Sequence, residues 1–242
     1  MPNNNMQDNL ASNGAGKQKR IVISLGGSLV VPDEVDVSFL SAFVKLISEF
    51  VNDGFKFVII TGGGKTCRNY NNYLKSIVSP TEEDLDWMGI AATRLNAELV
   101  RIAFDGLAHP YIILDPDHMP ETDKSIIVGG GWKPGNSSDL AAVHVARIVN
   151  AGRVINLSNI DFAYDKDPNK YPDAKKIEDT TWAEFRKILP DEWHPGLSSP
   201  FDPVAARESE ELGLEVVIMN GKNIENLKNY LSGGEFSGTL IK

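Results

Sequence analysis

The sequence predicts an α/β fold in which a mostly parallel sheet carries helices on both faces. Apolar runs of strand length alternate with amphipathic helical patterns along nearly the whole chain. Glycine-rich turns follow several of these apolar runs directly. In such sheets, ligands bind at the carboxyl ends of the strands, so the glycine-rich turns mark the edge where a functional site is expected.

The expected elements follow from apolar spacing and from capping residues. Strands are predicted at residues 21–25, 57–61, 111–114, 125–128, 154–157, 215–219 and 238–241. Helices are predicted between them, at about 36–52, 65–75, 81–104, 140–149, 182–189, 202–212 and 223–231. Asp36 or Ser38 caps the first helix, and Gly213 ends the helix that begins at Asp202. The polar stretch 158–179 is expected to hold a short hairpin.

Length and composition limit the possible classes of protein. The 242 residues show no internal repeat or long linker, so we predict one domain over 20–242 after a disordered leader, 1–19, that is rich in Asn, Gly and Ser. The net charge of −9 argues against a general nucleic-acid binder. No apolar run approaches the ~20 residues of a membrane span. The one cysteine, Cys67, allows no intrachain disulfide and fits a reducing, cytoplasmic compartment.

The strongest local signal is the run of residues 57–65, which reads Phe-Val-Ile-Ile-Thr-Gly-Gly-Gly-Lys. A buried strand runs through bare glycines into the start of a helix, which leaves backbone N–H groups without partners. Such a turn binds phosphate well, because no side chain blocks approach and the helix dipole favours an anion. A tight strand-to-helix turn without a ligand is the alternative interpretation. Similar glycine turns after residues 25 and 128 favour the phosphate site.

A series of short motifs follows in order from Ile21 to the C-terminus. They are GGS at 26–28, GGGKxxR at 62–68, DxxGI at 86–90 with TRxNA at 93–97, PGxSSD at 134–139, SNxD at 158–161 with YxxDP at 164–168, DPxAA at 202–206 and GT at 238–239. In this order and at this spacing they resemble the amino acid kinase family, and within it the archaeal-type uridylate (UMP) kinases.

The resemblance implies a three-layer αβα sandwich with a mostly parallel central sheet. An N-lobe of about 20–150 would bind the acceptor nucleotide, and a C-lobe of about 151–242 would bind ATP. The implied reaction is direct transfer from Mg²⁺-bound ATP to the phosphate of UMP, in pyrimidine nucleotide biosynthesis. Relatives of this kind assemble as hexamers. No nucleic acid or membrane partner is implied, and the four histidines at 109, 118, 144 and 194 lack metal-ligand spacing.

Site residues are carried over from the family motifs to matching positions. ATP is expected to contact Gly27, Ser28, Gly64, Arg68, Ser158, Tyr164 and Asp167. UMP is expected to contact Gly63, Asp86, Trp132, Lys133, Pro134, Gly135, Asn136, Ser137 and Ser138. The residues expected to act on the transferred phosphoryl group are Lys65, Arg68, Asp139 and Asp202.

Each assignment has a simpler structural alternative. Arg68 also suits a solvated helix face, although a guanidinium fork binds phosphate oxygens well. Asp86 also suits the first turn of a helix, and Tyr164–Pro168 a surface turn. Ser137 or Ser138 also fits an N-cap, and Asp202–Pro203 is typical of an N-cap and first helical position.

The chain departs from the family pattern at three places. Many members carry a lysine where this chain has Ser24, a glycine where it has Phe162, and smaller residues where it has Trp132 and Lys133. The departures leave other acceptors open, namely isopentenyl phosphate or an amino acid. They also leave open a non-catalytic nucleotide or oxyanion binding or storage protein on the same fold, or a purely structural paralogue.

Overall fold

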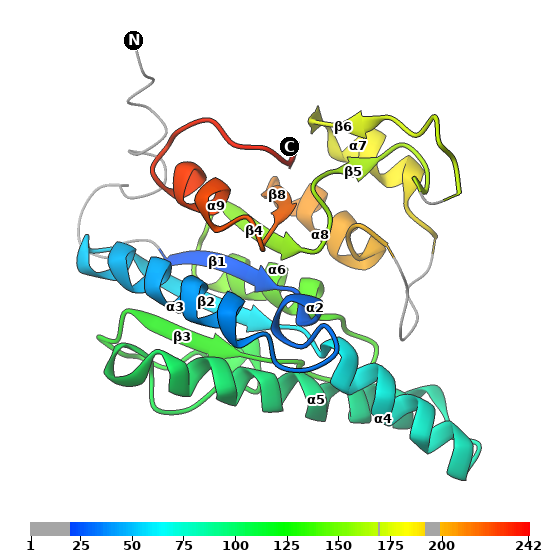
Figure 1. The fold of residues 1–242 in the computed structure, drawn as a ribbon, viewed down its shortest axis with the longest axis horizontal. Helices are drawn as coiled ribbons and strands as arrows, with labels where there is room; N and C mark the ends of the chain where they lie inside the picture. Colours follow the sequence, from blue (N-terminus) through cyan, green and yellow to red (C-terminus); the bar gives the residue numbers. More distant parts are fainter. Residues whose placement is uncertain (1–19, 169, 192–198) are drawn as a thin grey trace.

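The computed structural model describes residues 20–168, 170–191 and 199–242. The predicted leader, 1–19, and His194 lie outside the described residues. The main sheet has seven strands in the order β3-β2-β1-β4-β8-β9-β7 (Figure 1). These strands are β1 (Arg20–Leu25), β2 (Lys56–Thr61), β3 (Ile126–Gly129), β4 (Arg153–Ser158), β7 (Asp179–Thr180), β8 (Glu215–Asn220) and β9 (Thr239–Ile241).

The strand pairing is parallel from β3 to β8. Strand β9 pairs antiparallel to β8, and β7 pairs parallel to β9. A separate two-stranded antiparallel ribbon, β5 (Ala163–Tyr164) with β6 (Lys176–Ile177), forms the hairpin expected within 158–179. The predicted α/β class with a mostly parallel sheet is confirmed.

Helices cover both faces of the sheet. One hydrophobic core lies under α3 (Val37–Asn52), α5 (Glu82–Ala103) and α9 (Ile224–Leu231), and a second lies under α6 (Ser138–Ile148), α7 (Trp182–Phe185) and α8 (Pro203–Leu212). Two cores separated by one sheet make the three layers that the family resemblance implied (Figure 1). The remaining helical segments are α2 (Gly27–Val30), α4 (Gly64–Ile77), η1 (Asp105–Leu107), η2 (Pro116–His118) and η3 (Arg186–Ile188). No helix of the described residues combines the length and the apolar character that crossing a membrane requires.

Local chemistry explains most helix ends. The carboxylate of Asp36 accepts the Phe39 N–H at 3.0 Å, and Thr81 and Asp84 form a capping box at the start of α5. Gly213 ends α8 in the left-handed region, with φ of 60°. These caps were predicted for α3 and α8, and the apolar stripe of α3 is buried as expected.

The predicted strand at 111–114 is wrong. Only Ile113 bridges to the sheet, opposite Gly129, and its N–H donates to the Val128 carbonyl at 2.8 Å. Tyr111 and Leu114 point outward and remain exposed, at 73% and 50%. The run lies beyond the edge strand β3, where a local turn held by the His109 ring and the Tyr111 carbonyl, 2.8 Å apart, replaces ladder bonds.

The parallel register brings the ends of neighbouring strands together. Leu25 of β1 is paired with Thr61 of β2 on one side and with Leu157 of β4 on the other. Ile60 of β2 is paired with Gly129 of β3. The glycine turns after β1, β2 and β3 and the polar turn after β4 therefore share one edge of the sheet.

Candidate functional site

Two glycine turns, residues 26–28 after β1 and 62–64 after β2, pack backbone against backbone. A methyl carbon built on Gly27 would lie 2.1 Å from the Gly64 nitrogen, and one on Gly64 would lie 2.2 Å from the Gly27 carbonyl oxygen. Gly64 also has φ of 60°, in the left-handed region that favours glycine. Both positions require glycine for the contact between turns, whatever ligand they bind.

The same two turns present unpaired backbone donors. The N–H groups of Gly27, Ser28, Gly63 and Gly64 donate to no acceptor among the described residues. Gly64 begins α4, a helix of 14 residues, so the positive end of the helix dipole lies at this turn. Free amides at a helix start form the anion-binding geometry that the sequence predicted here.

The two predicted cations beside these turns differ in their surroundings. Nη1 of Arg68 lies 3.4 Å from the Ser28 hydroxyl, so the first turn of α4 reaches across to the turn after β1. Nζ of Lys65 lies 3.3 Å from Asp33 in a solvent-exposed ion pair. Arg68 is therefore placed at the paired turns, whereas Lys65 must leave an exposed partner to act there.

The third glycine turn, 129–131 after β3, is not an open anion site. The Gly131 N–H donates to the Thr93 hydroxyl at 2.6 Å. A methyl carbon on Gly130 would lie 3.0 Å from the Arg94 nitrogen, so glycine allows this turn to touch the α5 backbone. This turn therefore differs from the other two, because α5 packs against it and takes up the Gly131 amide.

Helix α5 also holds the loop 132–138 that follows this turn. The Arg94 guanidinium donates to the carbonyls of Gly131 at 3.2 Å and of Trp132 at 3.1 Å. Two turns earlier, the carboxylate of Asp86 accepts the Gly135 N–H at 2.7 Å. Burial raises the pKa of the Asp86 carboxyl, and the Gly135 amide opposes that shift. Asp86 thus contacts the predicted acceptor loop, although its predicted ribose contact stays a prediction.

The aromatic member of the loop packs toward α6. The Trp132 and His144 rings lie 5.2 Å apart, and Nζ of Lys133 lies 3.9 Å from the centre of the Trp132 ring. Nε2 of His144 is 2.9 Å from a carboxylate oxygen of Glu208 on α8. The Trp132 ring is therefore supported from α6 and capped by its neighbour Lys133.

The rest of the loop turns into α6. The Asn136 side chain donates to the Pro134 carbonyl at 3.1 Å, and Ser138 is the first residue of the helix. The Ser137 hydroxyl accepts the Leu140 N–H at 3.1 Å, so Ser137 is the N-cap that the sequence left open between two serines.

Asp139 occupies the centre of the strand edge. Its Oδ1 accepts the Ser24 hydroxyl from β1 and the Asn156 amide from β4, both at 2.8 Å. The backbone N–H of Asp202 lies near enough to this carboxylate to favour its charged form and oppose the rise in its pKa. Although the residue keeps some solvent contact, its carboxyl group is enclosed. Burial, helped by the nearby charge of Asp202 and opposed by the Ser24 and Asn156 hydrogen bonds, raises its pKa to about 6.

Asp202 combines a capping role with a place beside Asp139. Its Oδ1 accepts the Ala205 N–H at 2.7 Å, which confirms the predicted N-cap of α8. Burial raises the pKa of its carboxyl. The Ser137 hydroxyl lies near enough to oppose that shift, yet the buried Oδ2 has no partner at hydrogen-bond distance among the described residues. The cap and a functional role for Asp202 are therefore compatible.

The predicted ATP-side residues line one pocket of about 430 Å³ beyond β4. Ser158, Tyr164 and Asp167 all contribute to its walls. Phe162 lines the same pocket, with Nζ of Lys176 4.9 Å from the centre of its ring. The hairpin β5–β6 therefore brings Tyr164 and Asp167 to the same pocket as Ser158, and Phe162 forms part of its wall.

Sequence reasoning missed three residues that organise the site. Asn156 is a polar residue inside an apolar strand, a signal that could have identified it as a partner for a buried acid. Thr93 and Arg94 were read only as part of a motif, because nothing in the sequence shows that α5 touches the turn after β3. Within the described residues no cluster of three or more His, Cys, Asp or Glu side chains could hold a metal ion.

Comparison with known proteins gives consistent matches. A model described as the amino acid kinase family matches residues 19–220. Uridylate kinase from Sulfolobus acidocaldarius is 32% identical over 213 residues, 86% of this chain and 93% of that protein. Uridylate kinase from Methanospirillum hungatei is 33% identical over 225 residues, 91% and 94% of the two chains. The crystal structure of uridylate kinase from Archaeoglobus fulgidus superposes with a TM-score of 0.79 at 30% identity, covering 92% of this chain and all of that one.

The raised pKa of Asp139 predicts a pH-dependent stability difference for Asp139→Asn. The Asp139 carboxyl has a pKa of 3.8 in the unfolded chain and about 6 in the folded chain, so between these pH values the folded chain binds more protons. The free energy of unfolding therefore falls as pH rises through this range, and above pH 6 the ionised carboxylate destabilises the folded chain by its full amount. Asparagine keeps the oxygen that accepts from Ser24 and Asn156. We expect Asp139→Asn to raise the free energy of unfolding by on the order of 1–2 kcal/mol at pH 8 and by nothing at pH 4.

Urea unfolding of both proteins at pH 4, 6 and 8 measures this difference. If the two proteins were equally stable at every pH, or if Asp139→Asn were less stable than the wild type at pH 8, the carboxylate charge would not be disfavoured by burial at this position.

Proposed function

This chain belongs to the amino acid kinase family, and we propose that it transfers the terminal phosphoryl group of ATP to the phosphate of UMP, giving ADP and UDP. The observation that carries the proposal is the similarity to archaeal uridylate kinases over about nine tenths of the chain. The geometry supports it independently, since unpaired amides of two turns meet at one strand edge.

In the proposed mechanism, an oxygen of the UMP phosphate attacks the terminal phosphorus of ATP as the bond to the bridging oxygen of ADP breaks. Both reacting groups are anions, so the protein must align them and offset their charge. The amides of Gly27, Ser28, Gly63 and Gly64 are available as donors to phosphate oxygens. Arg68, beside Ser28, adds a charged fork suited to the equatorial oxygens of the transferred group.

The two acids suit the Mg²⁺ that accompanies ATP. Mg²⁺ is usually held by one or two carboxylates together with substrate phosphates, so Asp139 and Asp202 suffice without a larger cluster. The buried, unpartnered Oδ2 of Asp202 is a ligand atom of the right kind, and burial disfavours the charge of both acids until a cation arrives. When bound, Mg²⁺ would offset the charge of the phosphates.

We further propose that the two nucleotides divide between two lobes, at about 20–150 for UMP and 151–242 for ATP. The cavity beyond β4 supports the ATP half, because a hydroxyl, an aromatic ring and a carboxylate line it together. The loop 132–138, held by α5 and α6, supports the UMP half. A cytoplasmic location is part of the same proposal, and the single, half-buried Cys67 is compatible with it.

An acceptor panel tests the proposed reaction. ADP release is measured in a coupled assay with Mg²⁺, ATP and one of UMP, CMP, isopentenyl phosphate, acetylglutamate or aspartate. We expect turnover with UMP well above that with every other acceptor. Turnover with another acceptor and none with UMP would refute the substrate, and ATP binding without ADP formation from any acceptor would favour a non-catalytic binder.

Arg68→Ala is predicted to lower kcat/KM for UMP by roughly 2 kcal/mol or more of transition-state stabilisation, because it removes a charged donor at the paired turns. Lys45→Ala is the control, an exposed cation on α3 outside the paired turns and outside α4. The same coupled assay measures both. Equal kinetics for Arg68→Ala and the control would remove Arg68 from the mechanism.

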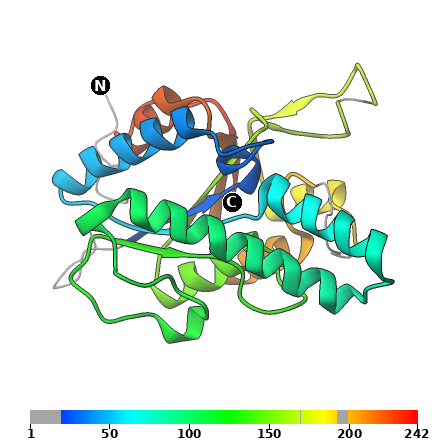
Figure 2. The same cartoon turned by 60° about the horizontal axis from the view of Figure 1, so that its bottom comes forward.

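We also propose that the chain is a homo-oligomer, and by its family resemblance a hexamer, with α4 and α5 at a contact between copies. None of the 14 residues of α4 is buried, and the helix lies beside α5 at the end of the molecule (Figure 2). Isolated helices of that length are marginal in water, so packing against a partner would stabilise it.

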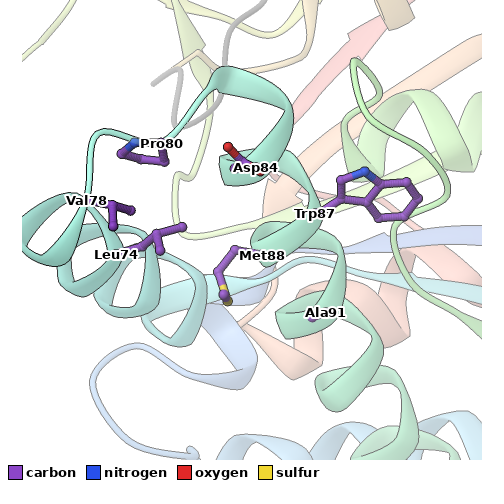
Figure 3. A pocket seen from close by; sticks show the side chains of 7 residues that line it. All are labelled: Leu74, Val78, Pro80, Asp84, Trp87, Met88 and Ala91. Atoms are coloured by element: carbon purple, nitrogen blue, oxygen red, sulfur yellow. The ribbon is translucent and has the colours of Figure 1, made fainter.

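The surface shared by α4 and α5 is apolar. Trp87, Leu95 and Ile102 of α5 are 48%, 64% and 63% exposed along one stripe about 22 Å long. Between the helices lies a groove of about 400 Å³, in which Leu74 points toward Met88, whereas the Trp87 ring points away from α4 (Figure 3). Scattered exposed apolar residues are normal on a monomer, whereas a continuous patch of this kind is typical of an interface.

The charges on the two helices favour a second copy as the occupant. Helix α4 carries Lys65, Arg68 and Lys75 and no acid, whereas the first turn of α5 carries Glu82, Glu83 and Asp84. In a two-fold arrangement α4 of each copy would lie against α5 of the other, so each basic helix would meet an acidic helix start.

Leu95→Glu tests this surface through the molar mass measured by light scattering after gel filtration. We expect the wild type to elute at a multiple of the 26.5 kDa chain and Leu95→Glu at a smaller mass, because a charge would be buried in the contact. Val37→Glu is the control, an equally exposed apolar position at the start of α3. A monomeric wild type, or an unchanged mass for Leu95→Glu, would place the contact elsewhere.

A further inference from the structure

We propose that Arg94 is a positioning residue for the acceptor, which orients two peptide groups of the loop after β3 so that their N–H groups are free to bind it. The inference rests on the proposed function, because it assigns the loop 132–138 to the acceptor nucleotide. It concerns a residue that the proposed mechanism does not use.

Arg94 binds carbonyl oxygens instead of a carboxylate. Its Nε donates to Gly131, and its Nη2 donates to Trp132 and, at 3.4 Å, to Leu114. Among the described residues, no carboxylate lies within ion-pair distance of the guanidinium, which is half-buried. A charged group placed among three carbonyls fixes their directions, because the planar fork has only one orientation that satisfies them together.

These two loop carbonyls determine where the next amides point. In a trans peptide the C=O and the following N–H lie in one plane and point in opposite directions. With the Gly131 and Trp132 carbonyls turned toward Arg94, the N–H groups of Trp132 and Lys133 point away from it. Neither N–H donates to an acceptor among the described residues. Arg94 therefore presents a pair of adjacent free donors at the start of the loop.

The neighbouring contacts explain why Arg94 alone has this role. Thr93 accepts the Gly131 N–H at 2.6 Å, and Asp86 accepts the Gly135 N–H at 2.7 Å. These contacts consume amides at each side of the pair, whereas Arg94 consumes carbonyls and leaves the amides of Trp132 and Lys133 available. A phosphate oxygen or a pyrimidine carbonyl is the acceptor chemistry that two adjacent N–H groups suit.

The same helix supplies a matched control. Arg101 lies two turns after Arg94 on α5 and pairs with Glu98, its Nε 2.6 Å from the carboxylate. It touches no carbonyl of the loop among the described contacts. Arg101→Ala removes the same side chain from the same helix without changing any loop peptide.

The test measures dissociation constants by calorimetry for UMP and for a non-hydrolysable ATP analogue, in wild type, Arg94→Ala, Arg94→Lys and Arg101→Ala. We expect Arg94→Ala to weaken UMP binding by at least about tenfold, the factor for one lost hydrogen bond from a charged group, with binding of the ATP analogue unchanged. Arg94→Lys keeps the charge but lacks the fork, so it should weaken UMP binding as well. Millimolar guanidinium should restore part of the UMP affinity of Arg94→Ala and leave Arg101→Ala unaffected.

Other results overturn the proposal. Unchanged UMP binding in Arg94→Ala would do so, as would an equal loss for both ligands without rescue by guanidinium, which indicates damage to the fold. If Arg94→Ala does not fold, Arg94→Lys decides, and wild-type UMP binding in it refutes the positioning role. If the wild type binds no UMP, both the proposed function and this inference fail. If the wild type binds UMP and Arg94→Ala binds it equally well, only this inference fails.

Discussion

The close backbone contact between the turns after β1 and β2 is the constraint on which the site depends. Gly27 and Gly64 touch at distances that no side chain permits, so the two turns act as one unit. Because β1 and β2 are parallel neighbours in register, that unit sits at the strand edge, where the buried Asn96 amide also donates to the Gly62 carbonyl at 2.8 Å. Four amides of these turns have no acceptor among the described residues, because α2 and α4 begin here and the first N–H groups of a helix have no carbonyl one turn earlier.

Helix α5 holds the turn after β3, on the other side of the site. One side of it meets the turn after β3 through Thr93 and Arg94, and its buried residues Ala97 and Val100 join the core under the sheet. The opposite stripe, with Leu95 and Ile102, faces solvent. The same helix therefore contacts the loop on one side and exposes an apolar stripe on the other.

The sequence predicted the layers, the order of elements and most helix caps, because these depend on local periodicity and on residues such as Asp36 and Gly213. It failed at 111–114, where an apolar run of strand length lies outside the last strand and has no partner for its backbone. It also treated three glycine turns as equivalent. Only tertiary contacts distinguish them. Two of the glycine turns pack against each other, whereas the third packs against Thr93 and Arg94. The spacing of residues in the sequence does not show which neighbour packs against a glycine.

Two neighbouring acids, Asp139 and Asp202, make the site negatively charged. Asp139 receives neutral donors from Ser24 and Asn156, and Asp202 adds a second charge of the same sign. Within the described residues no lysine or arginine forms an ion pair with either acid, so the starts of α6 and α8 supply the local positive charge. The side chains of the site therefore leave its negative charge only partly offset, and a cation bound there would stabilise the enclosed carboxylates. Ligand binding and folding are then coupled at this point, because whatever supplies the missing charge also stabilises the folded chain.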